Sequence, residues 1–255
     1  MEIPFYIFLF IFGSLIGSFL NVIILRTKNN ENIVWGRSYC PKCKKKLASF
    51  DLIPIISFLF LGGKCRYCRN KISWQYPAVE FITAILFLLA GIIWLDQAGD
   101  FLLLLRNLIF IAFAILIFVY DYRWQIIPDR FSIPAIILIL ILNLFLGVPI
   151  LTLLIGALIA GGFFLFQFVI SKGRWIGGGD IRLGILMGVL LGWERTLLAL
   201  LIAYVGGAVI SIFLIIFLKK KMNSQVAFGT FLLVATLVAV FWGDNLINFY
   251  LGNIF

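Results

Sequence analysis

The chain has 255 residues but no histidine, and only 13% of its side chains are charged. The absence of histidine excludes serine and cysteine proteases whose nucleophile depends on a histidine base. A serine–lysine protease is not excluded, because Ser73 lies near Lys71 and Ser171 beside Lys172, although neighbouring residues on a helix do not usually face each other. Hydrophobic residues make up 63% of the chain and the mean hydropathy is +1.12. This composition is too apolar for a soluble domain and predicts an all-α polytopic membrane protein.

Long apolar runs divide the chain into about eight segments that we expect to be transmembrane helices. They lie at residues 4–25, 77–95, 102–120, 131–147, 150–170, 181–193, 196–218 and 226–242. The sixth run is short and follows three consecutive glycines, Gly177, Gly178 and Gly179. Since each glycine disfavours a helix by about 1 kcal/mol relative to alanine, we predict that the backbone leaves helical geometry there.

The formal net charge of +10 is distributed unevenly along the chain. Of the 21 Lys and Arg residues, 19 fall in four alternate loops, at residues 26–71, 123–130, 172–182 and 219–221. Only Arg106 and Arg195 fall on the other side. The positive-inside rule therefore places those four loops in the cytoplasm and both termini outside. This explains the basic charge as a topology signal, so we expect no nucleic-acid partner. The first apolar run lacks a basic leader and a cleavage site, so we expect it to be a retained span.

The four cysteines form two CxxC pairs in the first cytoplasmic loop, and these pairs are separated by 21 residues. They are Cys40, Cys43, Cys65 and Cys68. The spacing is close to that of a zinc ribbon. Four thiolates complete a tetrahedron around Zn²⁺ without an open position, so we predict a structural zinc site. Disulfides are disfavoured in a cytoplasmic loop, and a redox CxxC pair is a third alternative.

An apolar stretch at residues 50–61 separates the two cysteine pairs and is too short to span a bilayer. We expect it to lie at the membrane interface or to cover the helical bundle. The adjacent lysines at residues 44–46 form either a solvated face or a binding site for anionic lipid headgroups. Membrane lipids are therefore among the expected partners.

Two aspartates lie where apolar runs meet the cytoplasmic boundary. Asp121 ends the third run, where the helix dipole disfavours an anion, so a purely structural role explains it poorly. Asp180 opens the sixth run, where capping the helix is the alternative to a chemical role. If the two carboxylates meet, they can share a proton, so that one activates water while the other protonates a substrate carbonyl. This pairing predicts an aspartyl hydrolase. Acids that move ions across a membrane would be expected nearer mid-bilayer, which argues against a transporter.

Two further polar residues interrupt apolar runs near the same boundary. Asn21 lies in the first run, where a hydrogen bond between helices is the structural alternative to a functional role. Glu80 lies one turn inside the second run, where the helix dipole favours a carboxylate. A structural and a substrate-facing role remain equally open for Glu80.

Five motifs in order give the chain a resemblance to a known family. They are GSFLNVIILR at residues 17–26, the two CxxC pairs, YPAVE at 76–80, DYRWQIIPD at 121–129 and GGGDIR at 177–182. The chain resembles the type IV prepilin peptidases, bacterial membrane aspartyl proteases that trim the leaders of type IV prepilins and type II secretion pseudopilins. The last motif matches the GxGD pattern that these enzymes share with presenilin-like intramembrane proteases.

The resemblance implies a catalytic pair, Asp121 and Asp180, with Asp129 as a second motif acid that is not catalytic. Gly177, Gly179 and Arg182 belong to the same motifs. It also implies cleavage after a glycine on the cytoplasmic side of the bacterial inner membrane. Many members then methylate the new N-terminus with S-adenosylmethionine. That activity is associated with the N-terminal part, where Asn21, Arg26 and Glu80 are the candidates, and the cysteines resemble the family's zinc-associated module.

The expected organisation is a first transmembrane helix at residues 1–26, a zinc-ribbon-like cytoplasmic loop at 27–76 and a seven-helix protease domain at 77–255. The expected substrates are prepilins or pseudopilins. Two alternatives remain: a peptidase without methyl transfer, and a presenilin-like protease that cuts transmembrane helices more broadly. The long CxxC loop favours the prepilin reading over the second alternative.

Overall fold

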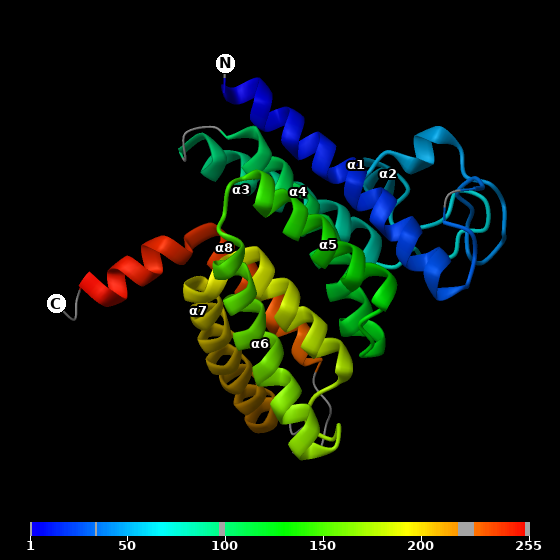
Figure 1. Cartoon of the computed structure of the whole chain (residues 1–255). Helices are drawn as coiled ribbons and strands as arrows, with labels where there is room; N and C mark the ends of the chain where they lie inside the picture. The colour runs from blue at the N-terminus through cyan, green and yellow to red at the C-terminus, as the bar shows by residue number, and fades with distance from the viewer. Residues whose placement is uncertain (1, 34, 97–99, 219–226, 253–255) are drawn as a thin grey trace. The chain divides into compact units, whose positions relative to one another are not determined.

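The computed structural model describes residues 2–33, 35–96, 100–218 and 227–252, and these residues form helices and loops without a β-strand (Figure 1). The chain divides into an N-terminal unit, Met1–Leu116, and a C-terminal unit, Ile117–Phe255. The boundary falls within α4 (Phe101–Trp124). The predicted topology signal at residues 219–221 lies outside the described residues.

The N-terminal unit contains α1 (Glu2–Lys28), η1 (Ser49–Leu52), α2 (Ile56–Phe60), α3 (Gln75–Asp96) and most of α4. Helices α1 and α3 pack closely because α1 carries glycine at the contact. A Cβ at Gly13 would lie 2.8 Å from Ala84 Cα, and one at Gly17 would lie 2.7 Å from Glu80 Cα. The small residues of the first run therefore serve close helix packing.

The C-terminal unit contains the end of α4, α5 (Asp129–Phe145), α6 (Ile150–Ser171), α7 (Gly178–Leu218) and α8 (Phe228–Gly252). Its core joins buried residues of α6, α7 and α8, among them Phe164, Met187 and Leu232. Helices α6 and α7 meet at Gly156 and Gly188, where a Cβ on either residue would collide with the backbone of the other helix.

Six described helices are long and apolar enough to cross a membrane. With 17 residues, α5 is shorter. The 41 residues of α7 would reach about 60 Å as one helix, twice the thickness of a hydrocarbon core. However, Gly192 breaks this helix with φ 72° and ψ 179°, a conformation almost confined to glycine. The predicted sixth and seventh spans are the two segments of α7, and the prediction of an all-helical polytopic protein is confirmed.

Side-chain hydrogen bonds stabilise the break in α7. Asn143 of α5 is fully buried and donates through Nδ2 to the carbonyl of Val189, at 2.6 Å. The Thr196 hydroxyl donates to the carbonyl of Gly192, at 2.5 Å. Because a break leaves carbonyls without helical partners, these donors replace bonds that a continuous helix would have made.

The glycine turn before Asp180 is more regular than predicted. Helix α7 begins at Gly178, and none of Gly177, Gly178 and Gly179 has a positive φ. The predicted departure from helical geometry is therefore present at Gly177, which precedes the helix, but not at Gly178 and Gly179. Gly179 is needed for space instead, because a Cβ there would lie 2.6 Å from Ile127 Cβ.

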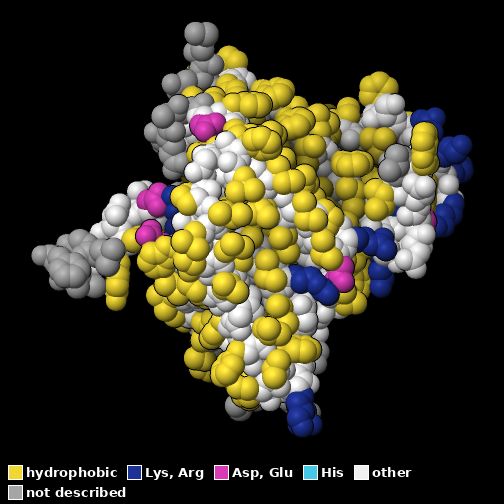
Figure 2. All heavy atoms as spheres, viewed as in Figure 1, with side chains coloured by type: hydrophobic (Ala, Val, Ile, Leu, Met, Phe, Trp, Pro, Cys, Tyr) yellow, Lys and Arg dark blue, Asp and Glu magenta, His cyan; other side chains and the backbone are white. Residues whose placement is uncertain are grey.

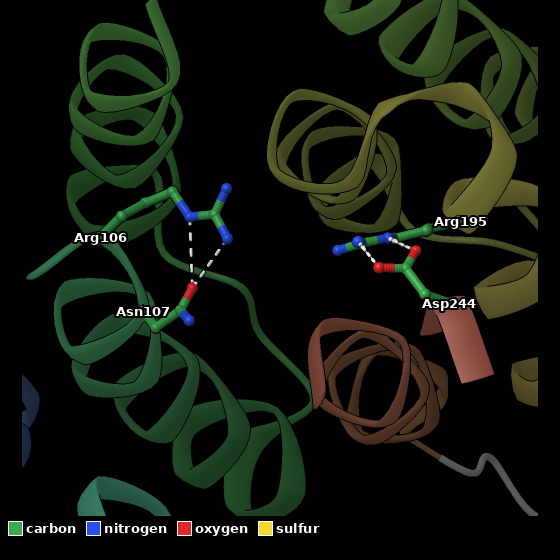
Figure 3. Close-up of polar contacts among 4 residues, drawn as sticks. All are labelled: Arg106, Asn107, Arg195 and Asp244. Carbon is green, nitrogen blue, oxygen red and sulfur yellow. Dashed lines mark hydrogen bonds and ion pairs between the residues drawn. The ribbon is translucent and has the colours of Figure 1, made fainter. Parts of the chain in front are cut away.

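The two arginines outside the basic loops each have a partner within their own unit (Figure 3). Arg106 donates through Nε and Nη2 to Asn107 Oδ1, at 3.2 and 2.9 Å. Arg195 of α7 donates through Nε to Asp244 Oδ1 of α8, at 2.8 Å, and the two side chains form an ion pair. Arg195 therefore links the second segment of α7 to α8.

Candidate active site and metal centre

Asp180 is positioned by the first turn of α7, of which it is the third residue. The backbone amide of Gly177 donates to Asp180 Oδ2, and the Asp180 amide donates to the Gly177 carbonyl, both at 3.1 Å. An acid at this position accepts a bond that the helix start would otherwise lack, and the helix dipole favours its charge. Asp180 is also buried, with 8% exposure. The expected capping role is therefore present, and it uses one carboxylate oxygen.

Asp121 lies in the last turn of α4 and is 5% exposed. A Cβ at Gly229 would lie 2.7 Å from Asp121 Oδ2, so the start of α8 touches this carboxylate. The backbone amides of Gly229 and Thr230 face it, although Oδ2 has no hydrogen-bond partner among the described residues. The partial positive charge at the N-terminus of α8 thus offsets the partial negative charge at the C-terminus of α4, which alone would disfavour an ionised Asp121.

Ile127 connects the surroundings of the two acids. Its side chain lies against Gly179, which precedes Asp180. It also lies against Gly229, where a Cβ would be 3.1 Å from Ile127 Cδ1. Leu183 of α7, three residues after Asp180, also lies against Gly229, where a Cβ would be 3.0 Å from Leu183 Cδ1. The structure therefore brings Asp121 and Asp180 into one region of the C-terminal unit, while their catalytic role stays a prediction.

The second motif acid is placed differently. Asp129, the first residue of α5, forms an ion pair with Arg182 of α7. The Asp129 side chain is 56% exposed. Asp129 and Arg182 therefore tie the start of α5 to the first turn of α7, beside the acids but at the surface.

Sequence reasoning missed Gly229 and Ile127. Nothing in the local sequence marks Gly229, because its importance comes from contact with Asp121, more than a hundred residues earlier. Ile127 lies inside a motif that was recognised, but its neighbours on α7 and α8 are set by the tertiary fold. A glycine near the start of the eighth apolar run does not by itself point to an acid on another helix.

The four cysteines converge into one cluster. Their sulfur atoms lie within 4.8 Å of one another, and the Sγ atoms of Cys40 and Cys68 are 3.9 Å apart. Tetrahedral zinc with Zn–S bonds of about 2.3 Å would require sulfurs about 3.8 Å apart. None of the four forms a disulfide. The cluster therefore fits a four-coordinate zinc site.

The two halves of this cluster repeat the same backbone pattern. Lys44 and Arg69 each follow a CxxC pair, have φ of 59° and 57°, and donate to the carbonyls of Cys40 and Cys65, at 2.8 and 2.9 Å. The backbone amides of Cys40 and Cys65 donate in turn to the carbonyls of Lys45 and Asn70, at 3.0 and 2.9 Å. Each half is also closed by an isolated antiparallel bridge. Two matching turns therefore present two sulfurs each.

The thiols of this cluster differ in acidity. The backbone amide of Asn70 lowers the pKa of Cys68 to about 7. The amide of Lys45 favours the Cys43 thiolate, but desolvation and the sulfurs of Cys40 and Cys68 raise the pKa of Cys43 to about 11. Metal ligation requires all four thiols to be deprotonated, and a divalent cation offsets the repulsion among the resulting negative charges.

Arg26, at the end of α1, is 5% exposed and surrounded by carbonyl oxygens. Its guanidinium donates to the backbone of the following loop, at distances of 2.7 to 3.4 Å, through Asn32, Ile33, Trp35, Gly36 and Arg37. A buried arginine needs such partners. Arg26 therefore fixes the path of the chain from α1 into the cysteine loop.

Asn21 and Glu80 join α1 and the cysteine loop to α3. Asn21, with 1% exposure, donates through Nδ2 to the Tyr76 carbonyl, at 3.0 Å. Glu80 Oε2 accepts a bond from the amide of Ile55, at 2.7 Å. The three candidates for methyl transfer therefore lie in one unit, and each is engaged by the protein's own backbone.

Two family models and several known proteins are similar to this chain. The model of the bacterial peptidase A24 N-terminal domain matches residues 11–94, and that of the type IV leader peptidase family matches residues 108–212. A prepilin leader peptidase/N-methyltransferase of Bacillus subtilis is 34% identical over 95% of this chain and 96% of its own length. The chain belongs to the type IV leader peptidase family.

Other relatives of this leader peptidase are also named prepilin leader peptidase/N-methyltransferase. Those of Aeromonas salmonicida and Legionella pneumophila are each 30% identical, over 96% and 97% of this chain and over 93% and 94% of their own lengths. No solved structure matches the chain. The N-terminal family model covers α1 from residue 11 onward, the cysteine cluster and most of α3, and the second covers both aspartates.

Proposed function

We propose that this protein is a membrane aspartic endopeptidase that removes the leader peptide of prepilins, and that Asp121 and Asp180 form its catalytic pair. The observation that carries the proposal is the position of Asp121, a buried carboxylate whose Oδ2 has no hydrogen-bond partner among the described residues. Such a group destabilises the fold, and a role in the reaction explains why the protein keeps it. Family membership and the names of the relatives support the substrate class.

In the proposed reaction one carboxylate is ionised and the other is protonated. The ionised member removes a proton from water, whose oxygen attacks the carbonyl carbon of the residue before the scissile bond. The protonated member donates its proton to the carbonyl oxygen. Breaking the C–N bond then yields a carboxylic acid on the leader, while the amine of the mature pilin takes the proton held by the pair. The helix starts of α7 and α8 supply positive ends near the developing charges.

We place this chemistry on the cytoplasmic side of the bacterial inner membrane. The support is the excess of Lys and Arg in the loops at residues 26–71, 123–130 and 172–182. The end of α4 and the start of α7 flank the second and third of these loops. Pseudopilins of type II secretion, which share the prepilin leader, belong to the same proposed substrate class.

We further propose that methylation of the new N-terminal amine by S-adenosylmethionine follows cleavage, as the relatives' names suggest. The N-terminal unit is the proposed location. However, Asn21, Arg26 and Glu80 already bond to the protein's own backbone. These contacts occupy the Asn21 amide, the Arg26 guanidinium and one Glu80 oxygen, and they support a positioning role.

The cysteine cluster would hold one structural Zn²⁺ through Cys40, Cys43, Cys65 and Cys68. When bound, zinc supplies crosslinks between the two turns, and four thiolates leave no open position for water. We therefore assign the metal to the stability of the loop and exclude it from peptide hydrolysis.

The test is cleavage of a prepilin leader peptide by the purified protein in detergent, comparing Asp121→Asn, Asp180→Asn and Asp129→Asn. Asparagine keeps the size of aspartate and removes the titrating acid. We expect the first two substitutions to lower the cleavage rate at least about 100-fold, the range typical of general acid–base groups. Asp129→Asn is the matched control, because it belongs to the same motif but is exposed and paired with Arg182.

Thermal unfolding followed by tryptophan fluorescence shows whether each variant is folded. Active, folded Asp121→Asn protein would overturn the assignment of the pair. Loss of cleavage in folded Asp129→Asn protein would make that acid the partner of Asp180. Transfer of labelled methyl groups to the processed peptide distinguishes the bifunctional enzyme from a peptidase alone.

A further inference from the structure

The loop between α1 and α3 carries a group of large apolar side chains on its surface. Helix α2 turns Phe58 inward, where its ring lies 4.9 Å from that of Trp74 and its exposure is 8%. The neighbouring side chains point outward. Trp35, Leu52, Ile53 and Tyr67 of this loop are also exposed. Five of the exposed side chains are those of Phe50 at 76%, Ile56 at 50%, Leu59 at 67%, Phe60 at 88% and Trp74 at 74%. We call these five residues the apolar face.

The apolar face is fixed at the edge of the membrane-spanning helices of its own unit. The loop leaves α1 at Lys28 and enters α3 at Gln75, so both of its ends are tethered to spans. In addition, Glu80, one turn inside α3, accepts a hydrogen bond from the amide of Ile55, the residue immediately before α2. Helix α2 is therefore held at the level of the first turn of α3.

The bond from Ile55 to Glu80 holds an unfavourable backbone conformation. Ile55 has φ 62° and ψ −53°, which is rare for a β-branched residue. Such strain persists only where the surroundings impose it. Here it directs Ile56, Leu59 and Phe60 outward while Phe58 packs inward. A loop that only needed to connect two zinc-binding turns would not require this arrangement.

The charge around the apolar face has one sign. Residues 29–74 contain nine Lys or Arg and two acidic residues, and Figure 2 shows the Lys and Arg side chains gathered over this part of the molecule. Both acids are engaged. Asp51 pairs with Arg66 at 2.7 Å, and Glu31 accepts bonds from the Tyr39 hydroxyl at 2.5 and 2.6 Å, which lowers the pKa of Glu31. Lys44 and Lys45 lie over the rings of Tyr39 and Tyr67, at 4.8 and 5.5 Å from the ring centroids, and both lysines stay exposed. Exposed apolar groups beside exposed cations suit an anionic lipid surface.

We propose that α2 and its flanks seat the zinc-binding loop in the anionic leaflet where α1 ends and α3 begins, with the apolar face among the acyl chains and the lysines of residues 44–46 at the headgroups. Glu80 acts as a positioning residue in this arrangement, because it fixes the strained Ile55 from which α2 starts. The basic surroundings argue against a basic peptide as the occupant, because like charges would repel it.

The test is photo-crosslinking from position 60 in the full-length, zinc-loaded protein. Phe60 is replaced by p-benzoylphenylalanine, and the protein is reconstituted into nanodiscs of phosphatidylglycerol and phosphatidylcholine with a prepilin peptide present. Mass spectrometry of the adduct identifies the neighbour. We expect phospholipid as the main adduct. The same replacement at the buried Phe58 is the matched control and should crosslink to the protein itself.

Two sets of variants separate the anchoring contributions. Replacing Lys44, Lys45 and Lys46 with glutamine should lower the lipid adduct at least about twofold in discs containing phosphatidylglycerol, and leave it unchanged in pure phosphatidylcholine. Glu80→Leu, which removes the acceptor for the Ile55 amide and retains its zinc content, should lower the adduct in both kinds of disc. Position 60 crosslinking mainly to the prepilin peptide would make the apolar face a substrate site and overturn the proposal. Crosslinking mainly to the protein's own helices, or an adduct insensitive to all these variants, would also overturn it. None of these readouts depends on cleavage.

Discussion

The buried charges of the two units have different surroundings. In the N-terminal unit, Arg26, Glu80 and Arg106 each bond to groups of the same unit. In the C-terminal unit, Asp121 keeps an oxygen without a hydrogen-bond partner among the described residues. Both units bear the cost of burying charge in an apolar protein. The bonds of Arg26 and Glu80 hold a loop in place, whereas the unpaired oxygen of Asp121 is left for the proposed chemistry.

Of the changes that would distinguish the two units, loss of the metal should have the largest effect. Replacing the buried Cys40 and Cys65 with serine should reduce bound zinc from about one ion per chain to near zero, and amide exchange across residues 29–74 should accelerate strongly. Structural zinc contributes about 10 kcal/mol in small zinc-binding peptides, so we expect a loss of several kcal/mol in the local stability of the loop.

Peptide cleavage should fall less than tenfold in the same variant, because the proposed catalytic pair belongs to the other unit. Lys42→Ala lies within the first CxxC pair and should retain the metal. Unchanged amide exchange in the zinc-free protein would mean that the loop folds without metal.

Gly229→Ala in the C-terminal unit should have the opposite pattern, with cleavage lost and zinc kept. The added methyl would lie 2.7 Å from Asp121 Oδ2, so it must displace the carboxylate. Since displacements of about 1 Å can cost about 100-fold in rate, we expect a cleavage rate about 100-fold lower with little change in zinc content or thermal stability. Gly206→Ala is the control, because nothing lies within 4 Å of a Cβ there. Full activity of Gly229→Ala would show that Asp121 does not depend on the start of α8.

A smaller effect is expected from Arg26→Met, which keeps the apolar stem and removes the donors to the loop carbonyls. Hydrogen bonds from a charged group contribute about 1.5–3 kcal/mol. We expect a loss of about 2 kcal/mol in local stability, seen as faster amide exchange in the loop after α1. Arg37→Met, at an exposed position, should leave it unchanged. If methyl transfer were lost while exchange stayed at the wild-type rate, Arg26 would be a direct participant in that reaction.

The smallest effect is expected at the ion pair between Arg195 and Asp244, whose side chains are 31% and 57% exposed. Exposed pairs contribute about 0–1 kcal/mol. Replacing either residue with alanine should change the free energy of unfolding by less than about 1 kcal/mol, and a double-mutant cycle would measure the coupling. A coupling well above this range would indicate that the pair orients α8, and with it Gly229.

The apolar runs and the cysteine spacing were sufficient to predict the helices, the polytopic fold and the clustering of the thiols, because each depends on local composition or on a metal's fixed demand for ligands. The division into residues 1–26, 27–76 and 77–255 stays a prediction. The break at Gly192 could be placed only roughly, since a turn between two apolar runs leaves little trace when it contains neither proline nor a long polar loop.

Tertiary contacts set the features that sequence reasoning could not reach. Gly229 touches Asp121 from a helix that begins more than a hundred residues later, and the carbonyls around Arg26 depend on the path of a loop. The dipole argument against Asp121 as a structural acid was correct for α4 alone. It could not include the start of α8, which supplies the missing positive end.

The repeated backbone pattern of the two CxxC turns has an evolutionary consequence. Because each turn supplies two of the four sulfurs with the same hydrogen bonds, the module has the form of a duplicated half-site. Neither half alone can complete a tetrahedral tetrathiolate. Selection on the cysteines should therefore act on the four as a set. A lineage that loses one pair gains no metal site from retaining the other, and we expect the two pairs to be inherited or lost together.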